Sequence, residues 1–152
     1  MAKIILIFAS MSGNTEMMAH AVADGVTANS EKIEVIDIMD GLEVTDLEGF
    51  DGILLGAYTW GDGELPDDFL DFYDDLDSMN LAGIKAAVFG SCDSAYPHYG
   101  AAVDILMEKL TERGAEVYPL GLKIELTPDE KEEEACRTFG NEFVSFLKSP
   151  CL

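Results

Sequence analysis

Short apolar runs alternate along the chain with segments in which apolar residues recur at helical spacing. The runs at residues 4–9, 33–38, 53–57, 86–90 and 117–124 predict β-strands. Two of them, 53–57 and 86–90, are apolar at nearly every position, which is typical of parallel strands covered by helices on both faces. The run at 33–38 alternates apolar and polar positions, which favours the edge of a sheet.

The segments between these runs predict helices. The last helix has the clearest start, because Thr127 supplies an N-cap, Pro128 the first helical position and Glu130 a capping box. Residues 41–49 are too short and polar for more than a single turn after Thr45. The other helices are predicted from three apolar stripes, formed by Met18, Val22 and Val26, by Phe69, Phe72, Tyr73 and Leu76, and by Val103, Leu106, Met107 and Leu110.

This alternation of strands and helices predicts an α/β fold. Its expected form is a doubly wound, five-stranded parallel sheet with helices on both faces. No linker, repeat or low-complexity tract interrupts residues 1–152, so a single domain is expected. Right-handed crossovers place ligand sites outside the carboxyl ends of the strands, where the winding direction reverses.

The turn after the first run is rich in polar donors. Ser10-Met11-Ser12-Gly13-Asn14-Thr15 leads directly from a strand into a helix, whose free N–H groups carry partial positive charge. The segment therefore predicts an anion site, most simply for a phosphate. Residues 4–31 and 33–84 contain no Lys or Arg, so hydroxyls and backbone dipoles would hold the phosphate alone. The same segment also fits an ordinary capped helix.

Two further loops are expected at the same edge of the sheet. Residues 58–64 follow the third strand and read Tyr-Thr-Trp-Gly-Asp-Gly-Glu, and residues 91–99 follow the fourth. Trp60, Tyr96 and Tyr99 offer flat side chains that can cover a planar ring. The alternative for Trp60 is packing in the core or at its rim, although its place in a polar loop favours the ring.

Composition restricts the partners. The formal net charge of −21 and the pI of about 4.1 argue against nucleic acid and anionic membranes. No apolar run approaches the ~20 residues of a membrane span. No export-type cleavage region follows the first apolar run, so a cytoplasmic protein is expected. The three cysteines, Cys92, Cys136 and Cys151, form no C-x-x-C pair, which argues against a disulfide framework or a zinc site.

The three loops, in this order and with this spacing, resemble those of flavodoxins over essentially the whole chain, and the length resembles the short-chain branch. The resemblance implies strand order 2-1-3-4-5 with FMN at the switch point, an arrangement for which flavodoxin itself is a reference case. The residues that it implies in cofactor binding are Ser10, Met11, Ser12, Gly13, Asn14, Thr15, Tyr58, Thr59, Trp60, Gly61, Asp62, Ser91, Cys92, Asp93, Tyr96, His98, Tyr99 and Gly100.

The resemblance also implies roles for these residues. The loop from Ser10 to Thr15 would bind the FMN phosphate, while Trp60 and Tyr96 would sandwich the isoalloxazine ring. The Gly61-Asp62 peptide would turn its carbonyl toward flavin N5 on one-electron reduction, which a glycine makes easy because it can adopt positive φ. Backbone donors of Asp93 and Gly100 would face the pyrimidine edge of the ring, with His98 nearby.

Two positions depart from the pattern of the family. Tyr58 stands where many flavodoxins have a Ser that adds a hydroxyl to the phosphate site. Cys92 stands where they often have Gly, which brings a thiol close to the ring. We interpret Cys92 as a small buried side chain in preference to a redox thiol.

The implied function is that of a low-potential FMN carrier, not an enzyme, which shuttles single electrons between redox proteins such as flavoprotein reductases and iron–sulfur or haem enzymes. Half of the 30 acidic residues lie between positions 33 and 84, and those from Asp62 to Asp77 flank the proposed flavin edge. Their negative field would oppose a flavin anion and steer a partner with a basic docking face. A monomer is expected.

Two other functions compete with electron transfer. An FMN-dependent reductase of a small quinone-type molecule would need a cavity above the ring, whereas Trp60 and Tyr96 are expected to close both ring faces. A signalling receiver domain of the same topology needs an acidic pair after the first strand and a phosphoacceptor Asp after the third. Ser10-Met11 and Tyr58-Thr59 occupy those places, which excludes the receiver.

Overall fold

A computed structural model describes residues 3–10, 13–29, 31–41, 43–59, 65–92, 100–125 and 128–149. The strands form one parallel sheet of order β2-β1-β3-β4-β5, and β6 also pairs with β4. The elements are β1 Lys3–Phe8, α1 Asn14–Thr27, β2 Lys32–Asp37, η1 Ile38–Asp40, η2 Val44–Leu47, β3 Gly52–Gly56, α2 Asp67–Asp75, η3 Leu76–Ser78, β4 Lys85–Cys92, α3 Ala101–Glu112, β5 Glu116–Val117, β6 Leu122–Glu125 and α4 Glu130–Lys148.

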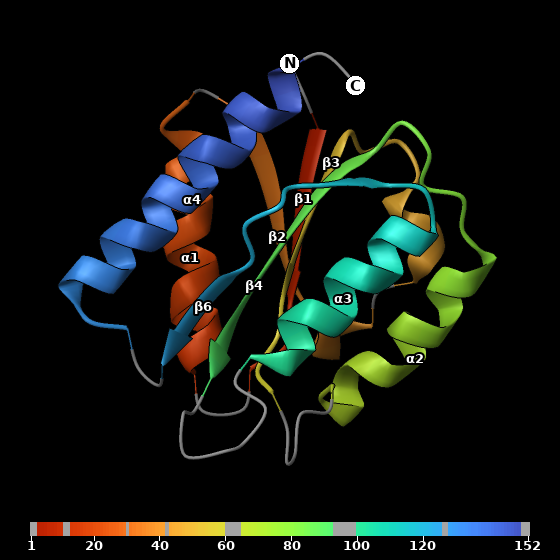
Figure 1. Cartoon of the computed structure of the whole chain (residues 1–152), viewed down its shortest axis with the longest axis horizontal. Coiled ribbons are helices and arrows are strands. Elements are labelled where there is room, and N and C mark those ends of the chain that lie inside the picture. The colour runs from red at the N-terminus through yellow and green to blue at the C-terminus, as the bar shows by residue number, and fades with distance from the viewer. Residues whose placement is uncertain are drawn as a thin grey trace.

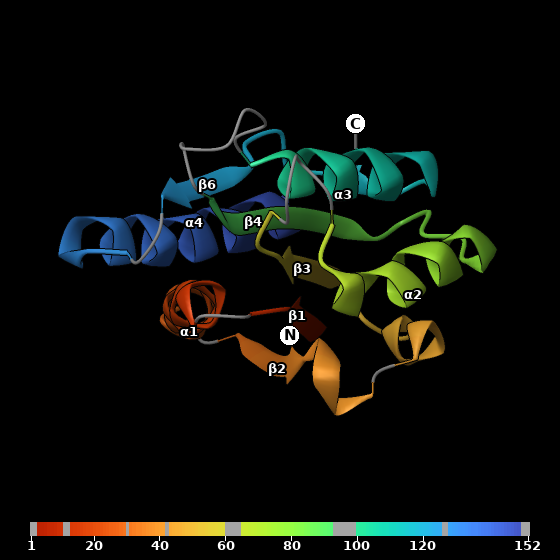
Figure 2. The same cartoon turned by 90° about the horizontal axis from the view of Figure 1, so that it is seen from below.

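Helices α1 and α4 cover one face of the sheet, and α2 and α3 cover the other (Figures 1 and 2). The alternation of side chains along β1 explains both layers: Ile4 and Leu6 pack with α1 and α4, whereas Ile5 and Ile7 pack with α2 and α3. Strands β3 and β4 are buried along their whole length, as their apolar runs predict. The doubly wound parallel sheet and its strand order are confirmed.

Two smaller predictions are confirmed as well. The alternating strand β2 lies at the edge of the sheet. The single turn expected within residues 41–49 is η2, but it begins at Val44 with Glu43 as its N-cap, so Thr45 lies inside the turn and does not precede it; Glu43 and Asp46 form a capping box. This turn buries Val44 and Leu47 in the core on the α2 and α3 side of the sheet.

The last strand is broken, whereas the sequence predicted a continuous strand over residues 117–124. β5 pairs with the start of β4 and β6 with its end. The N–H of Tyr118 still donates to the carbonyl of Ala86 at 2.8 Å. Pro119 has no N–H to continue the ladder, and the side chain of Leu120 is 62% exposed. The sheet therefore loses this strand for a few residues.

Helix α4 begins at Glu130, with Asp129 as its N-cap, whereas the sequence predicted Thr127 as the cap. The Asp129 carboxylate accepts a hydrogen bond from the Glu132 N–H at 2.8 Å, and the Glu132 carboxylate accepts one from the Asp129 N–H at 3.2 Å. A carboxylate cap is charge-assisted and complements the helix dipole, which favours Asp129. Thr127 lies outside the described residues.

Helices α1 and α4 approach each other closely through two glycines. A Cβ atom at Gly25 would lie 2.0 Å from the carbonyl oxygen of Arg137, and one at Gly140 would lie 2.1 Å from that of Val22. Any larger residue would force the two backbones apart.

Within the part of the chain that the structure describes, neither α4 nor another helix is long and apolar enough to cross a bilayer.

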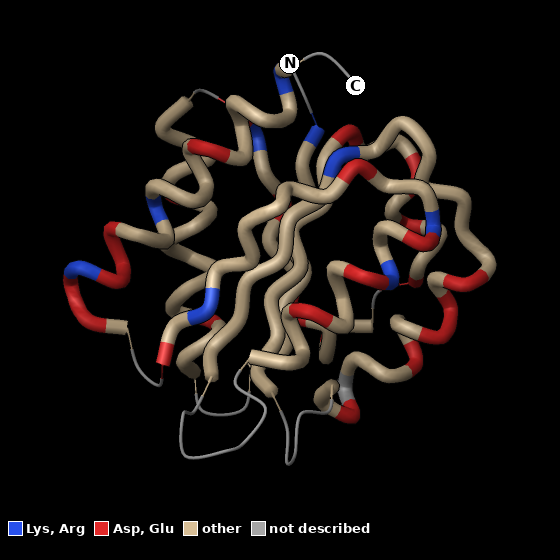
Figure 3. The backbone as a smooth tube through the Cα atoms, viewed as in Figure 1, with Lys and Arg blue, Asp and Glu red and all other residues tan. Residues whose placement is uncertain are grey.

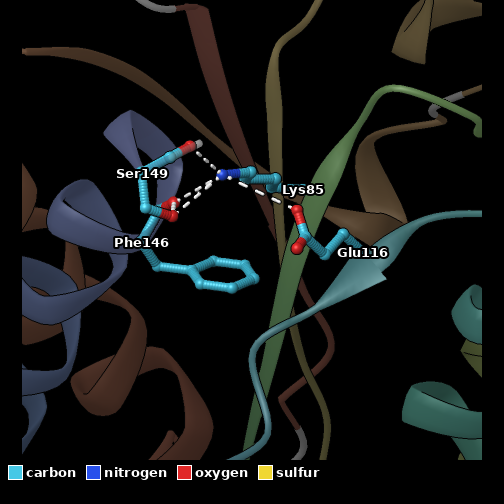
Figure 4. A network of polar contacts seen from close by, with 4 residues as sticks. All are labelled: Lys85, Glu116, Phe146 and Ser149. Atoms are coloured by element: carbon cyan, nitrogen blue, oxygen red, sulfur yellow. Dashed lines mark hydrogen bonds and ion pairs between the residues drawn. The ribbon is translucent and has the colours of Figure 1, made fainter. Parts of the chain in front are cut away.

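Lys85, at the start of β4, anchors the end of α4 (Figure 4). Its side chain is buried, and its ammonium donates to the carbonyl of Phe146 at 2.8 Å and to Ser149 through the carbonyl and the hydroxyl. The Glu116 carboxylate lies 3.6 Å away and the Phe146 ring centroid 5.0 Å away. A cation thus satisfies carbonyls at the negative end of the α4 dipole.

We expect Lys85→Met to lower the free energy of unfolding by about 2 kcal/mol, because it leaves the carbonyls of Phe146 and Ser149 without their donor. Urea unfolding followed by circular dichroism measures the change. Lys32→Met is the matched control: Lys32 is exposed at the start of β2, and its loss should change stability by less than about 0.5 kcal/mol. Equal losses in the two variants would contradict the anchoring role.

Candidate functional site

The polar turn after β1 is organised around the hydroxyl of Ser10. Its Oγ accepts hydrogen bonds from the backbone N–H groups of Gly13 at 3.0 Å and Glu16 at 3.4 Å. Gly13 has φ of 90° as the N-cap of α1, a conformation that favours glycine. A Cβ atom there would have nothing within 4 Å. Because Ser10 accepts both of these bonds, its own O–H remains a donor that an anion could use.

A buried bond between two hydroxyls joins the first predicted loop to the third. Thr15 Oγ1 and Ser91 Oγ lie 2.7 Å apart, and the two residues are only 1% and 6% exposed. The bond fixes the first turn of α1 against the end of β4. Two hydroxyls have two protons and this contact uses one, so the pair retains a further O–H donor.

A second bond joins the segment after β3 to the start of α3. The backbone N–H of Ala102 donates to Thr59 Oγ1 at 3.2 Å. Gly100 precedes the helix as its N-cap with φ of 68°, and its carbonyl accepts from the Val103 N–H at 3.0 Å. The N-termini of α1 and α3 are thus both tied to the carboxyl ends of the central strands.

A lysine that sequence reasoning missed lies against the same edge. Lys123 in β6 places its side chain over Gly100: a Cβ atom at Gly100 would lie 2.4 Å from Lys123 Cδ. Its ammonium binds the carboxylate of Asp104, in the first turn of α3, at 2.9 Å. In the sequence Lys123 is an ordinary polar position of a strand, and nothing in the pattern marks it.

Cys92 is a buried thiol at the end of β4. Its Sγ donates weakly to the carbonyl of Gly90 at 3.7 Å, and burial raises its pKa to about 11. A thiol that stays protonated at neutral pH is a poor nucleophile, which agrees with its interpretation as a small buried side chain. Tyr58, the other departure from the family pattern, packs half-buried against the core on the α2 and α3 side.

The structure brings together the predicted site residues that it describes. Four of them surround the start of α1, two follow β3, and three lie at the end of β4 and the start of α3: Ser10, Gly13, Asn14 and Thr15, then Tyr58 and Thr59, then Ser91, Cys92 and Gly100. The others lie outside the described residues, and their roles stay predictions: Met11, Ser12, Trp60, Gly61, Asp62, Asp93, Tyr96, His98 and Tyr99.

Helix α2 carries acidic residues and no basic ones. Figure 3 shows acidic positions in succession along this helix. Asp67, Asp71, Asp74 and Asp75 are exposed there, and no basic residue lies between positions 33 and 84 to neutralise them. The described ranges contain no group of three or more His, Cys, Asp or Glu residues that could hold a metal ion. The exposed carboxylates of α2 therefore give this surface a negative electrostatic potential.

Comparison with known proteins agrees with this geometry. The family model described as flavodoxin matches residues 6–140. The crystal structure of oxidised flavodoxin 1 from Bacillus cereus is 64% identical, with a TM-score of 0.92 over 95% of this chain and 98% of that one. Probable flavodoxin 2 of Bacillus subtilis is 44% identical over 154 residues, which cover 99% of each chain. A short-chain flavodoxin associated with a non-canonical PDU bacterial microcompartment is 32% identical, with a TM-score of 0.91 over 97% of this chain and 100% of that one.

We expect Cys92 and Cys136 to resist alkylation by iodoacetamide at pH 8 in the folded protein, because burial raises their pKa values to about 11 and about 12. Mass spectrometry of the labelled sites measures this. The control is the same chain unfolded in guanidinium, where both thiols should react. Equal labelling of Cys92 in the two states would contradict its burial.

The same shift sets the sign of a pH effect. Between pH 9 and pH 11 the Cys92 thiol ionises in the unfolded chain and stays protonated in the folded one, so the free energy of unfolding should fall as the pH rises.

Proposed function

The chain belongs to the flavodoxin family, whose members transfer electrons with bound FMN, and we propose that this protein holds FMN at the carboxyl edge of its sheet. The observation that carries this placement is the set of neutral donors around the start of α1. Bound FMN supplies the one-electron chemistry, while the chain binds it, orients it and sets the field around it.

The start of α1 has the chemistry of a phosphate site. Ser10 keeps its O–H as a donor, and the pair formed by Thr15 and Ser91 keeps another. The first turn of a helix adds backbone N–H groups and the positive end of its dipole. A phosphate oxygen accepts hydrogen bonds from all of these groups, so the donors fit FMN without a cationic side chain.

The ring is assigned to the carboxyl edge of the sheet, beside the segments that follow β3 and β4. Gly100 is proposed as a backbone donor to its pyrimidine edge, with Trp60 and Tyr96 as the residues that cover its faces. Support comes from the bond between Ala102 and Thr59, which holds the start of α3 beside the segment that leads to Trp60. A rigid donor position favours binding because little freedom is lost when the ring arrives.

An electron carrier is favoured over an enzyme that reduces a small molecule. The relatives named above are flavodoxins, which supports transfer between redox proteins and does not favour a quinone-type substrate. We infer that the chain has no substrate chemistry of its own. Cys92 supports this inference, because its high pKa makes it unsuited to a catalytic role at neutral pH.

The partners are proposed to be redox proteins with basic docking faces, such as flavoprotein reductases and iron–sulfur or haem enzymes. The exposed aspartates of α2 would attract such a face. A net charge of −21 also opposes association between copies of the chain, which supports a monomer. The free thiols of Cys92 and Cys136 fit the reducing conditions of the cytoplasm, the location that we propose.

We expect FMN to bind about 100-fold more tightly than riboflavin, because riboflavin leaves the donors at the start of α1 unused. Thr15→Val removes the hydroxyl that bonds Ser91 and should weaken FMN about tenfold, with a smaller effect on riboflavin. Quenching of flavin fluorescence gives both dissociation constants. Thr111→Val, an exposed change in the last turns of α3, is the matched control and should have no effect. Equal affinity of the parent for the two flavins would contradict the phosphate site.

Reduction of the FMN-loaded protein by a basic flavoprotein reductase should slow steeply as salt rises, since the Debye length is only about 8 Å at physiological ionic strength. Replacing exposed Asp71 and Asp75 by Asn should lower the low-salt rate by about threefold or more and flatten the salt dependence. Stopped-flow absorbance measures these rates.

The matched control for this experiment removes two exposed carboxylates from the opposite face of the sheet, by Asp24→Asn and Glu130→Gln. It changes the net charge equally and should retain most of the rate. Equal slowing in both double variants would mean that total charge, and not the α2 surface, attracts the reductase.

A further inference from the structure

Lys123 connects two elements at the edge where FMN is proposed to bind. Its aliphatic stem lies over Gly100, so closely that a Cβ atom there would meet Cδ, Cε and Cγ at 2.4, 2.8 and 2.9 Å. Its ammonium then reaches the Asp104 carboxylate at 2.9 Å. Lys123 thus extends from β6 across the N-cap of α3 to the first turn of that helix.

We call this contact of the Lys123 side chain with Gly100 and Asp104 the strap. A second contact holds the same end of α3. Thr59, from the segment after β3, accepts a hydrogen bond from the Ala102 N–H at 3.2 Å. Gly100 and Ala102 are therefore held from both sides of β4, by Lys123 of β6 and by Thr59 after β3. Removing one of the two ties leaves the helix N-terminus held from a single side.

The ion pair itself contributes little to the stability of the fold. The side chain of Lys123 is 27% exposed and that of Asp104 is 63% exposed, and an ion pair this close to water is largely screened. The closeness of the contact with Gly100 is the more informative feature. It fixes a glycine that already needs the left-handed conformation, with φ of 68°, and so fixes the direction of its backbone groups.

We propose that Lys123 is a positioning residue for the flavin ring, which acts by holding the backbone N–H of Gly100 toward the pyrimidine edge. The proposal rests on the FMN site proposed above. It makes a specific claim about chemistry: Lys123 serves the ring, which FMN and riboflavin share, and not the phosphate, which only FMN has. Both ends of the strap are required, the stem on Gly100 and the ammonium on Asp104.

The test compares the affinities of the full-length protein for FMN and for riboflavin. Lys123→Met keeps an aliphatic stem and loses the grip on Asp104, and it should weaken both flavins by the same factor of about five. Lys123→Arg restores a cation of similar reach and should bind both flavins within about twofold of the parent. Lys131→Met, which removes an exposed lysine from the first turn of α4, is the matched control and should change neither affinity.

A loss confined to FMN would make Lys123 a distant counter-charge for the phosphate and would overturn the proposal. Unchanged affinities in Lys123→Met would overturn it as well. If the parent protein bound neither flavin, the FMN site itself would fail, which is a separate result from either of these. Thermal unfolding of the apoprotein, expected to be nearly the same in the parent and in Lys123→Met, separates positioning from general destabilisation.

A second variant tests the contact directly. Gly100→Ala places a methyl group where Lys123 Cδ now lies and strains the backbone, so it should weaken both flavins by displacing the strap. Because Gly100→Ala and Lys123→Met act on one contact, the double variant should lose less affinity than the product of the two single losses. Losses that multiply fully would show that the two residues act independently, which contradicts the proposal.

Discussion

A sheet that is apolar on both faces must be covered on both faces, and most of this molecule follows from that requirement. β3 and β4 bury every residue, so neighbouring parallel strands need crossover helices on either side. Each crossover helix runs back against its strands, which brings the starts of α1 and α3 to the carboxyl ends of the strands (Figure 1). The positive ends of two helix dipoles thus lie at one edge of a strongly acidic chain.

Local pattern was sufficient where burial alone decides the structure. The strands, the helices and the edge position of β2 follow from periodicity, because periodicity records which side chains face the core. It was insufficient where two local solutions compete. Thr127 and Asp129 each begin a capping box, and the choice depends on which acceptor is stronger. The break in the last strand comes from Pro119, which has no N–H for the strand ladder. The hydropathy pattern misses this break because Pro119 stands within an apolar run.

The hydrogen bonds that join the loops of the site could not be predicted from the sequence pattern, for a different reason. Thr15 and Ser91 lie 76 positions apart, and Thr59 and Ala102 lie 43 apart, so neither residue of a pair signals the other. The sequence placed three loops at one edge, but it could not show that buried hydroxyls join them. It also left Lys123 as one polar position among many, since its role arises only when β6 lies beside Gly100.

Positive charge in this chain is used mainly for internal bonds. Lys85 closes the end of α4, and Lys109 lies buried between Asp77 and the ring of Tyr73, with its ammonium 4.2 Å from the ring centroid. The aspartates of α2 are left without cationic neighbours in the sequence.

If FMN binds as proposed, a phosphate held by Ser10, Thr15 and helix dipoles would add its own negative charge to this field, because the donors proposed to hold it are neutral. Hydrogen bonds can hold the FMN phosphate tightly while leaving the potential around the flavin negative, and a negative potential opposes the addition of an electron. Neutral donors would therefore allow tight cofactor binding without raising the redox potential of the flavin. A lysine at the same place would change both the affinity and the potential.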